Sequence, residues 1–154
     1  MSSDSDMLKW VKANLLSQST YVTTEDNLLM GESFDFLNMD TDQFPRIEMQ
    51  IVGSNGREFV TQCVRSRDCI ISLQGYMKRG DRPYADQDMF DIADFKAETE
   101  RIIYSIHNQV LAGAPDLPAN FIQLLAMTEA YIVHEIEPNV SSFLFNFTAE
   151  FEFQ

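Results

Sequence analysis

The chain has 154 residues, a length typical of one domain with its own hydrophobic core. Hydrophobic residues make up 45% of it and aromatic residues 12%, so a globular fold is expected. The formal net charge of −13, from 24 acidic and 11 basic side chains, argues against a protein that reads DNA or RNA, because phosphates would repel it. No apolar run is long enough to span a bilayer, and the acidic start lacks the basic and apolar regions of a signal peptide. We therefore expect a soluble, intracellular protein with no membrane partner.

The N-terminal third is predicted to hold one helix and one irregular segment. The helix, residues 1–18, has Asp4 or Ser5 as its N-cap. Its apolar residues should share one face: Met7, Leu8, Trp10, Val11 and Leu15. Residues 19–43 are acidic and fit either irregular structure packed by its apolar side chains or an arm that orders only on a partner. Residues 44–154 are predicted to form the sheet and long-helix core of the same single domain.

From Phe44-Pro45 onward the pattern indicates antiparallel strands. Apolar and polar residues alternate over residues 46–51, and the run Gly53-Ser54-Asn55-Gly56 follows. Asn-Gly is a strong hairpin signal because both residues tolerate positive φ. A return strand over residues 57–64, a turn at 65–68 and a third strand over 69–77 complete a predicted meander. Gly75, inside that third strand, permits a bulge or a close backbone approach.

The clearest helix signal begins after Asp88 or Asp91 and stops before Gly113 and Pro115. Its apolar stripe recurs at spacings of three and four residues: Ile92, Phe95, Thr99, Ile102, Ile103, Ile106 and Val110. This helix is expected to lie across one face of the sheet.

The end of the chain is predicted to be a β-hairpin. Residues 121–127 fit either a short helix or a strand, residues 131–135 look extended, and Pro138-Asn139 makes a turn. Residues 143–153 then alternate with period two, which places five phenylalanines and Ala149 on one face of a strand. That face must be covered by helices or by a neighbouring subunit, because an exposed aromatic strand aggregates. The fold class predicted is α+β: a mostly antiparallel sheet, one long amphipathic helix across a face, and an N-terminal helix.

The sequence carries no recognisable catalytic or metal-binding pattern. Cys63 and Cys69 are separated by five residues, which fits no common zinc or redox spacing and favours two buried, reduced thiols. His107 has no carboxylate at a ligand spacing, and with His134 it completes the histidines of the chain. We therefore expect no catalytic residue, no metal and no cofactor, and predict that the protein is not an enzyme.

The basic residues are distributed unevenly. Six of the eleven lie in one short span: Arg57, Arg65, Arg67, Lys78, Arg79 and Arg82. A basic patch on an acidic chain is suited to joining copies head to tail, so these six are the predicted subunit interface. The alternative is that they are ordinary solvated hairpin ends.

The order of these elements resembles that of the tail terminator proteins of tailed bacteriophages. The resemblance covers roughly Phe44 to Phe153. It rests on the start Phe44-Pro45-Arg46-Ile47, the strand from Arg67 to Tyr76, the helix from Ile92 to Val110, and the closing aromatic hairpin. It implies a homohexameric ring that caps the tail tube, stops its polymerisation and joins the tail to the head connector or another neck protein. It also implies that DNA passes through the lumen without specific binding. The expected location is the tail or neck of the virion, after assembly in the host cytoplasm.

Three other functions remain open. Another neck protein or the tube subunit itself would share many of these features, and filaments of the pure protein would favour a tube subunit. An acidic DNA mimic would bind a DNA-processing enzyme tightly and 1:1. An enzyme would need a deep pocket with convergent polar groups, which no spacing predicts. We rank the terminator first, followed by these alternatives in the order given.

Overall fold

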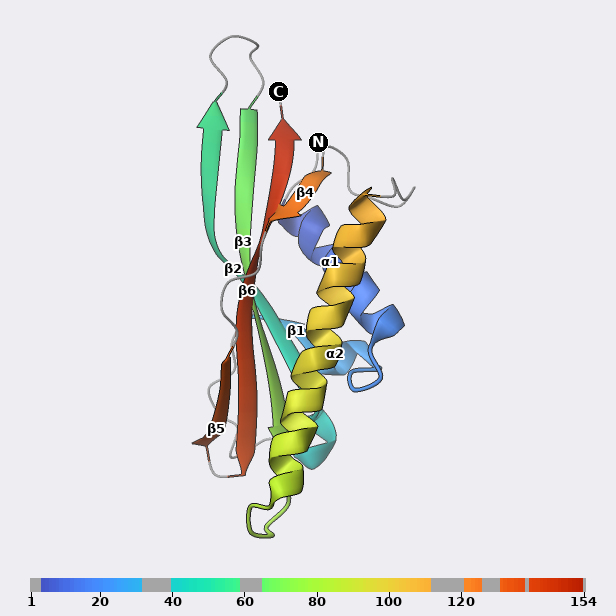
Figure 1. Cartoon of the computed structure of the whole chain (residues 1–154), viewed down its shortest axis with the longest axis vertical. Coiled ribbons are helices and arrows are strands. Elements are labelled where there is room, and N and C mark those ends of the chain that lie inside the picture. Colours follow the sequence, from blue (N-terminus) through green and yellow to red (C-terminus); the bar gives the residue numbers. More distant parts are fainter. Residues whose placement is uncertain are drawn as a thin grey trace.

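A computed structural model of the chain describes residues 4–31, 40–58, 65–111, 121–125, 131–137 and 139–153. The fold is α+β, as predicted: a mostly antiparallel sheet packs one face against two helices (Figure 1). Among the described residues the sheet has six strands, in the order β1-β2-β3-β6-β4, with β5 also paired to β6.

Helix α1 (Asp4–Gln18) confirms the predicted N-terminal helix, although Asp4 and Ser5, its predicted N-caps, lie within it. Met7, Val11 and Leu15 are fully buried, and Trp10 is nearly so. These positions recur at helical spacing, so one face of α1 enters the core while the other remains in solvent. Leu8 packs at the edge of the same cluster.

The segment after α1 is more ordered than its sequence indicates. It contains the short helix η1 (Glu25–Asn27), strand β1 (Leu28–Met30) and a second short helix, η3 (Thr41–Gln43). Strand β1 pairs in parallel with the following strand, and both Val22 and Leu28 are fully buried. The described part of this segment is therefore packed by its own apolar residues. Its residues 32–39 lie outside the described part.

The predicted three-stranded meander is wrong. Strand β2 (Arg46–Glu58) continues through the Asn-Gly signal and pairs with β3 (Arg65–Lys78), so that Asn55 faces Asp68. The expected turn at residues 65–68 is likewise strand, and the connection between the two strands falls in residues 59–64, outside the described part. Because β3 is paired along its whole length with β6 as well, long-range ladder bonds outweigh the local turn preference. The β2–β3 pairing is irregular at one place, where its register shifts between Ile51 and Gly53.

Helix α2 (Asp86–Leu111) is the predicted long helix. The stripe from Ile92 to Ile106 is buried as expected, whereas the side chain of Val110 is outside the described set. The helix begins slightly earlier than its apolar pattern suggests. Asp88 explains this, because its carboxylate accepts a hydrogen bond of 2.9 Å from the backbone N–H of Ala85, just before the helix.

The C-terminal third supplies three strands: β4 (Phe121–Leu125), β5 (Tyr131–Glu137) and β6 (Val140–Phe153). The ambiguous residues at 121–125 are thus a strand. Asn139, with φ of 68°, makes the turn between β5 and β6. Strand β6 is central, with β3 on one side and both β5 and β4 on the other.

The aromatic face of β6 is the centre of the core. Phe143, Phe145 and Phe147 are buried, while Leu144, Asn146 and Thr148 on the other face are half-buried. Phe95 of α2 meets the ring of Phe143 edge-on at 5.0 Å, and Tyr21 stacks on Phe95 at 5.0 Å. The predicted alternation is confirmed over residues 143–148, and the side chains of 149–153 are outside the described set. Helix α2, the segment after α1 and strand β6 therefore meet at one aromatic cluster.

Candidate functional site

The six basic residues of the predicted interface form two groups rather than one patch. Arg57, Arg65 and Arg67 lie near the end of the β2–β3 hairpin, where Arg57 faces Ser66 and Arg67 faces Gly56. Lys78 ends β3, and Arg79 and Arg82 follow it. Because β3 has 14 residues, the two groups lie roughly 40 Å apart along the strand. We call them the hairpin end and the basic corner. The side chains of the hairpin end are outside the described set.

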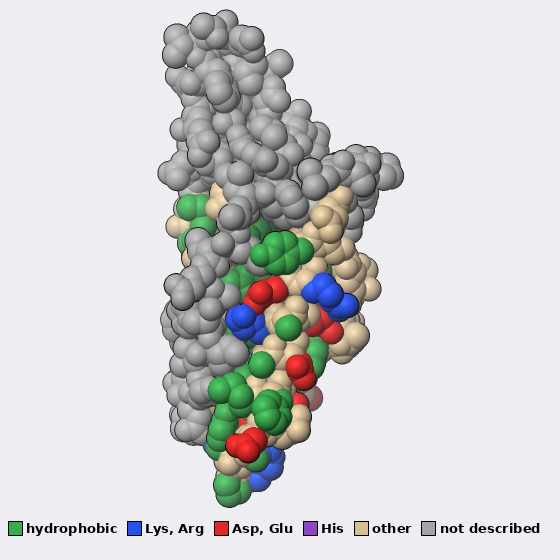
Figure 2. Space-filling view, viewed as in Figure 1, with side chains coloured by type: hydrophobic (Ala, Val, Ile, Leu, Met, Phe, Trp, Pro, Cys, Tyr) green, Lys and Arg blue, Asp and Glu red, His purple; other side chains and the backbone are tan. Residues whose placement is uncertain are grey.

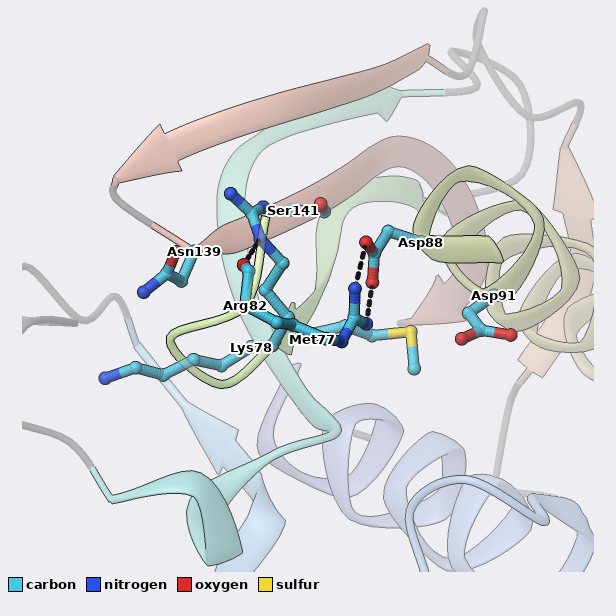
Figure 3. Close-up of a pocket in the computed structure, with 8 residues that line it drawn as sticks. Met77, Lys78, Arg82, Asp88, Asp91, Asn139 and Ser141 are labelled. Carbon is cyan, nitrogen blue, oxygen red and sulfur yellow. Dashed lines mark hydrogen bonds and ion pairs between the residues drawn. The ribbon is translucent and has the colours of Figure 1, made fainter. Parts of the chain in front are cut away.

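The basic corner is built around an ion pair between Arg82 and Asp88 (Figure 3). Nη1 of Arg82 donates to Oδ2 of Asp88 at 2.8 Å, and Nη2 donates to Oδ1, so the contact is bidentate. The hydrogen bonds from Arg82 lower the pKa of Asp88 to about 2, against the opposing effect of burial, and the Ala85 N–H adds to the lowering. The pair joins the loop after β3 to the first turn of α2.

The other two cations of the corner also have partners within the chain. Arg79 donates its backbone N–H to the carbonyl of Asn139 at 2.9 Å and its Nε to the carbonyl of Arg82 at 3.3 Å. The guanidinium carbon of Arg79 lies 5.3 Å from the centre of the Tyr84 ring. Nζ of Lys78 lies 6.0 Å from the centre of the Phe44 ring. The corner thus ties the end of β3 to the β5–β6 turn and to α2.

A small hollow of about 90 Å³ opens at this corner (Figure 3). It is lined by backbone and side chains from the end of β3, the loop, α2 and the start of β6: Met77, Lys78, Arg79, Arg82, Asp88, Asp91, Asn139 and Ser141. This volume is well below the several hundred Å³ of a typical small-molecule site. The lining holds no histidine to activate Ser141, and of its two carboxylates Asp88 is already held by Arg82. The arrangement is suited to a charged contact surface rather than to nucleophilic chemistry.

Metal-binding and thiol chemistry find little support in the described part of the chain. In that part, no group of three or more His, Cys, Asp or Glu side chains is placed to hold a metal ion. Cys69 is fully buried, as expected, whereas Cys63 and the side chains of His107 and His134 lie outside the described set.

Sequence reasoning missed a second surface, on the outward side of α2. Phe90 and Tyr104 are more than half exposed there, and Met89 beside Phe90 is 37% exposed. Figure 2 shows apolar side chains running along this helix between charged ones. The sequence did contain a signal for this surface. Apolar residues occur outside the buried stripe of α2, at positions where a surface helix normally carries polar groups.

No helix in the described ranges has both the length and the apolar character needed to cross a membrane. Compared with models of known protein families and with curated protein sequences, the chain shows no match.

Proposed function

We propose that the protein is a ring-forming structural subunit of a phage virion, of the kind that the tail terminators exemplify. In this role it caps the completed tail tube, stops its polymerisation and joins the tail to the head connector. The proposal starts from the resemblance in the order of elements. The structural observation that supports it best is the separation of the two basic groups at opposite ends of β3.

A closed ring of identical subunits needs two different, complementary surfaces on each subunit. Strands β2 and β3 extend beyond the helices at one end of the molecule and carry the hairpin end with them (Figure 1). Helix α2 carries six acidic and two basic side chains, a net charge of −4. The proposed ring contact sets the basic hairpin end of one subunit against the acidic helical side of the next, which favours head-to-tail closure.

The overall charge suits a ring through which DNA passes. With a net charge of −13, the subunit offers phosphates few cations, so a duplex in the lumen slides without being held. The cations of the basic corner are engaged within the chain, which further reduces their attraction for phosphate.

The alternative function, a DNA mimic, receives less support from helix α2. Of its carboxylates, Asp88 is held by Arg82 and Glu98 by residues 19 and 20, so both serve the fold. Phe90 and Tyr104 interrupt the remaining acidic surface. The observations that support a ring also fit a tube subunit. A tube subunit stacks ring upon ring, whereas a terminator forms a single ring.

The test is to measure the mass of the purified protein by native mass spectrometry over a concentration and salt series, with electron microscopy of the same samples. We expect a closed hexamer that gains stability at low salt. The variant Arg65→Glu/Arg67→Glu should shift it toward monomer, whereas the matched control Lys9→Glu/Lys12→Glu on α1 should not.

The same proteins are then added to growing tubes of the cognate tube subunit. Arrest of growth, with one ring at the tube end, is the expected result. Continuous filaments of the pure protein would instead make it a tube subunit. Failure to bind tube ends, together with a monomer under all conditions, would overturn the proposal.

A further inference from the structure

Helix α2 has a second apolar line on the side turned away from the sheet. It consists of Phe90, Ala93, Ala97 and Tyr104, which we call the outer stripe. Phe90 is 57% exposed and Tyr104 is 56% exposed, and Ala97 between them is exposed as well. Apolar side chains are visible along the outward side of this helix in Figure 2. Because Phe90, Ala97 and Tyr104 are seven residues apart, they lie on one line, which extends roughly 21 Å along the axis.

In the described part of the chain, the residues of this stripe are not members of the hydrophobic core cluster. The core face of α2 is a different set of positions, among them Ile92, Phe95 and Ile103, all buried. The opposite side of a surface helix normally carries polar residues. Two exposed rings in line with two small alanines indicate a contact surface for another helix.

The pattern is symmetric about Ala97, and this symmetry identifies the occupant. Phe90 lies seven residues before Ala97, and Tyr104 lies seven residues after it. If a second α2 crosses antiparallel at Ala97, each Phe90 meets a Tyr104 of the other copy, and the two Ala97 residues meet at the centre. The small side chains there let the helix axes approach closely, and the aromatic rings fill the flanks.

The charges beside the stripe follow the same symmetry. Asp94 and Arg101 are both exposed, and their spacing of seven residues places them on the same flank. In an antiparallel pair each flank faces the same flank of the partner, so Asp94 of each copy approaches Arg101 of the other. On the opposite flank, Lys96 is already paired with Glu100 of its own helix. The outer stripe is therefore complementary to itself in shape and in charge.

We propose that the outer stripe is a two-fold contact with a second copy of this chain, in which α2 packs antiparallel on α2 about Ala97. The contact goes beyond the ring role, because it is isologous and pairs α2 with α2, whereas the head-to-tail closure pairs the acidic side of α2 with the hairpin end of the next subunit. Because both contacts use α2, the two-fold contact joins subunits that are not closed into a ring.

A cysteine placed at the crossing point tests the geometry. In a Cys63→Ser/Cys69→Ala background, Ala97→Cys should form a disulfide-linked dimer under mild oxidation, because the two residues face each other across the axis. Thr23→Cys, at an exposed site outside α2, is the control and should remain monomeric on a non-reducing gel. Equal cross-linking at both positions, or none at Ala97→Cys, would overturn the proposal.

A charge exchange tests the pairing without touching the cysteines. Asp94→Arg should weaken dimerisation roughly tenfold or more, as read from the dimer Kd by sedimentation. Asp94→Arg/Arg101→Asp should restore it, because each pair is reformed with its signs exchanged. If the double variant dimerises no better than the single one, the stripe faces a different protein and the inference fails. The ring is assessed separately, by the response to Arg65→Glu/Arg67→Glu.

Discussion

The ring of Phe143 lies directly over Gly75, its partner across the β3–β6 ladder. A β-carbon at position 75 would overlap Cε1 and Cζ of that ring, so any side chain there forces Phe143 to move. Phe143 in turn meets Phe95 of α2 edge-on at 5.0 Å. The glycine thus allows an aromatic ring to fill the space between sheet and helix.

Gly75→Ala should therefore destabilise the fold by about 1–3 kcal/mol, because it overpacks the core. Gly53→Ala is the matched control: its β-carbon would meet Ile70 at an ordinary 3.6 Å. Urea unfolding of both variants measures the difference. In a double-mutant cycle, Phe143→Leu should recover part of the loss caused by Gly75→Ala. Additive losses would show that the overlap is relieved elsewhere.

Glu98 of α2 holds the turn that follows α1. Its carboxylate accepts hydrogen bonds from the backbone N–H of Thr20 at 2.7 Å, from Oγ of Ser19 at 3.0 Å, and from the hydroxyl of Thr20. Glu98→Ala should lower the free energy of unfolding by about 1 kcal/mol, because it removes charge-assisted hydrogen bonds and leaves the buried Ser19 hydroxyl without this acceptor, while the exposed donors of Thr20 can bind water. Glu100→Ala, which removes only an i,i+4 pair with Lys96, should cost about 0.5 kcal/mol or less.

The same carboxylate predicts a dependence of stability on pH. Burial alone would raise the pKa of Glu98, but the hydrogen bonds from Thr20 and Ser19 outweigh it, and the pKa lies below its usual value of 4.5. A carboxyl whose pKa is depressed on folding contributes stability above its unfolded pKa and loses it as the pH falls through the folded value. The stability difference between wild type and Glu98→Gln should therefore be full at pH 7 and shrink below pH 4.5. A difference that stays constant down to pH 3 would contradict this account.

Asp88 should titrate with a pKa of about 2, chiefly because it is hydrogen-bonded to Arg82. The variant Arg82→Gln removes the charged partner, so the pKa of Asp88 should rise toward 3.8. Carboxyl chemical shifts followed by NMR against pH give both values. Arg79→Gln is the control and should cause a smaller rise in the pKa of Asp88, because Arg79 acts on Asp88 only through a weaker electrostatic attraction, without a hydrogen bond.

Single-element periodicity predicted much of the fold. The buried faces of α1 and α2, and the alternation of β6 over residues 143–148, are confirmed, because an element that is buried on one side repeats its apolar residues at its own period. At Gly75 the sequence predicted a bulge or a close backbone approach, whereas the structure places the side-chain ring of Phe143 over it with no bulge in the ladder.

The candidate surfaces were predictable only in part. The six basic residues are close in sequence, but the uninterrupted β2–β3 hairpin carries three of them to one end of β3 and three to the other. The buried pair of Arg46 and Glu48, 2.7 Å apart on one strand, gave no sequence signal as an ion pair, because alternating charges also fit an exposed strand face. The outer stripe of α2 stood out only after the buried stripe was known.

The sequence by itself determined the fold class, the two main helices and the aromatic strand, because these depend on patterns within one segment. The tertiary structure alone decided the length of β2, the parallel addition of β1 and the central place of β6. Strand pairing depends on hydrogen bonds and side-chain contacts with partners as much as 88 residues away, as for Arg65 and Phe153, and no local pattern records them. At Gly53-Ser54-Asn55-Gly56 those distant bonds outweighed the strongest turn signal in the chain.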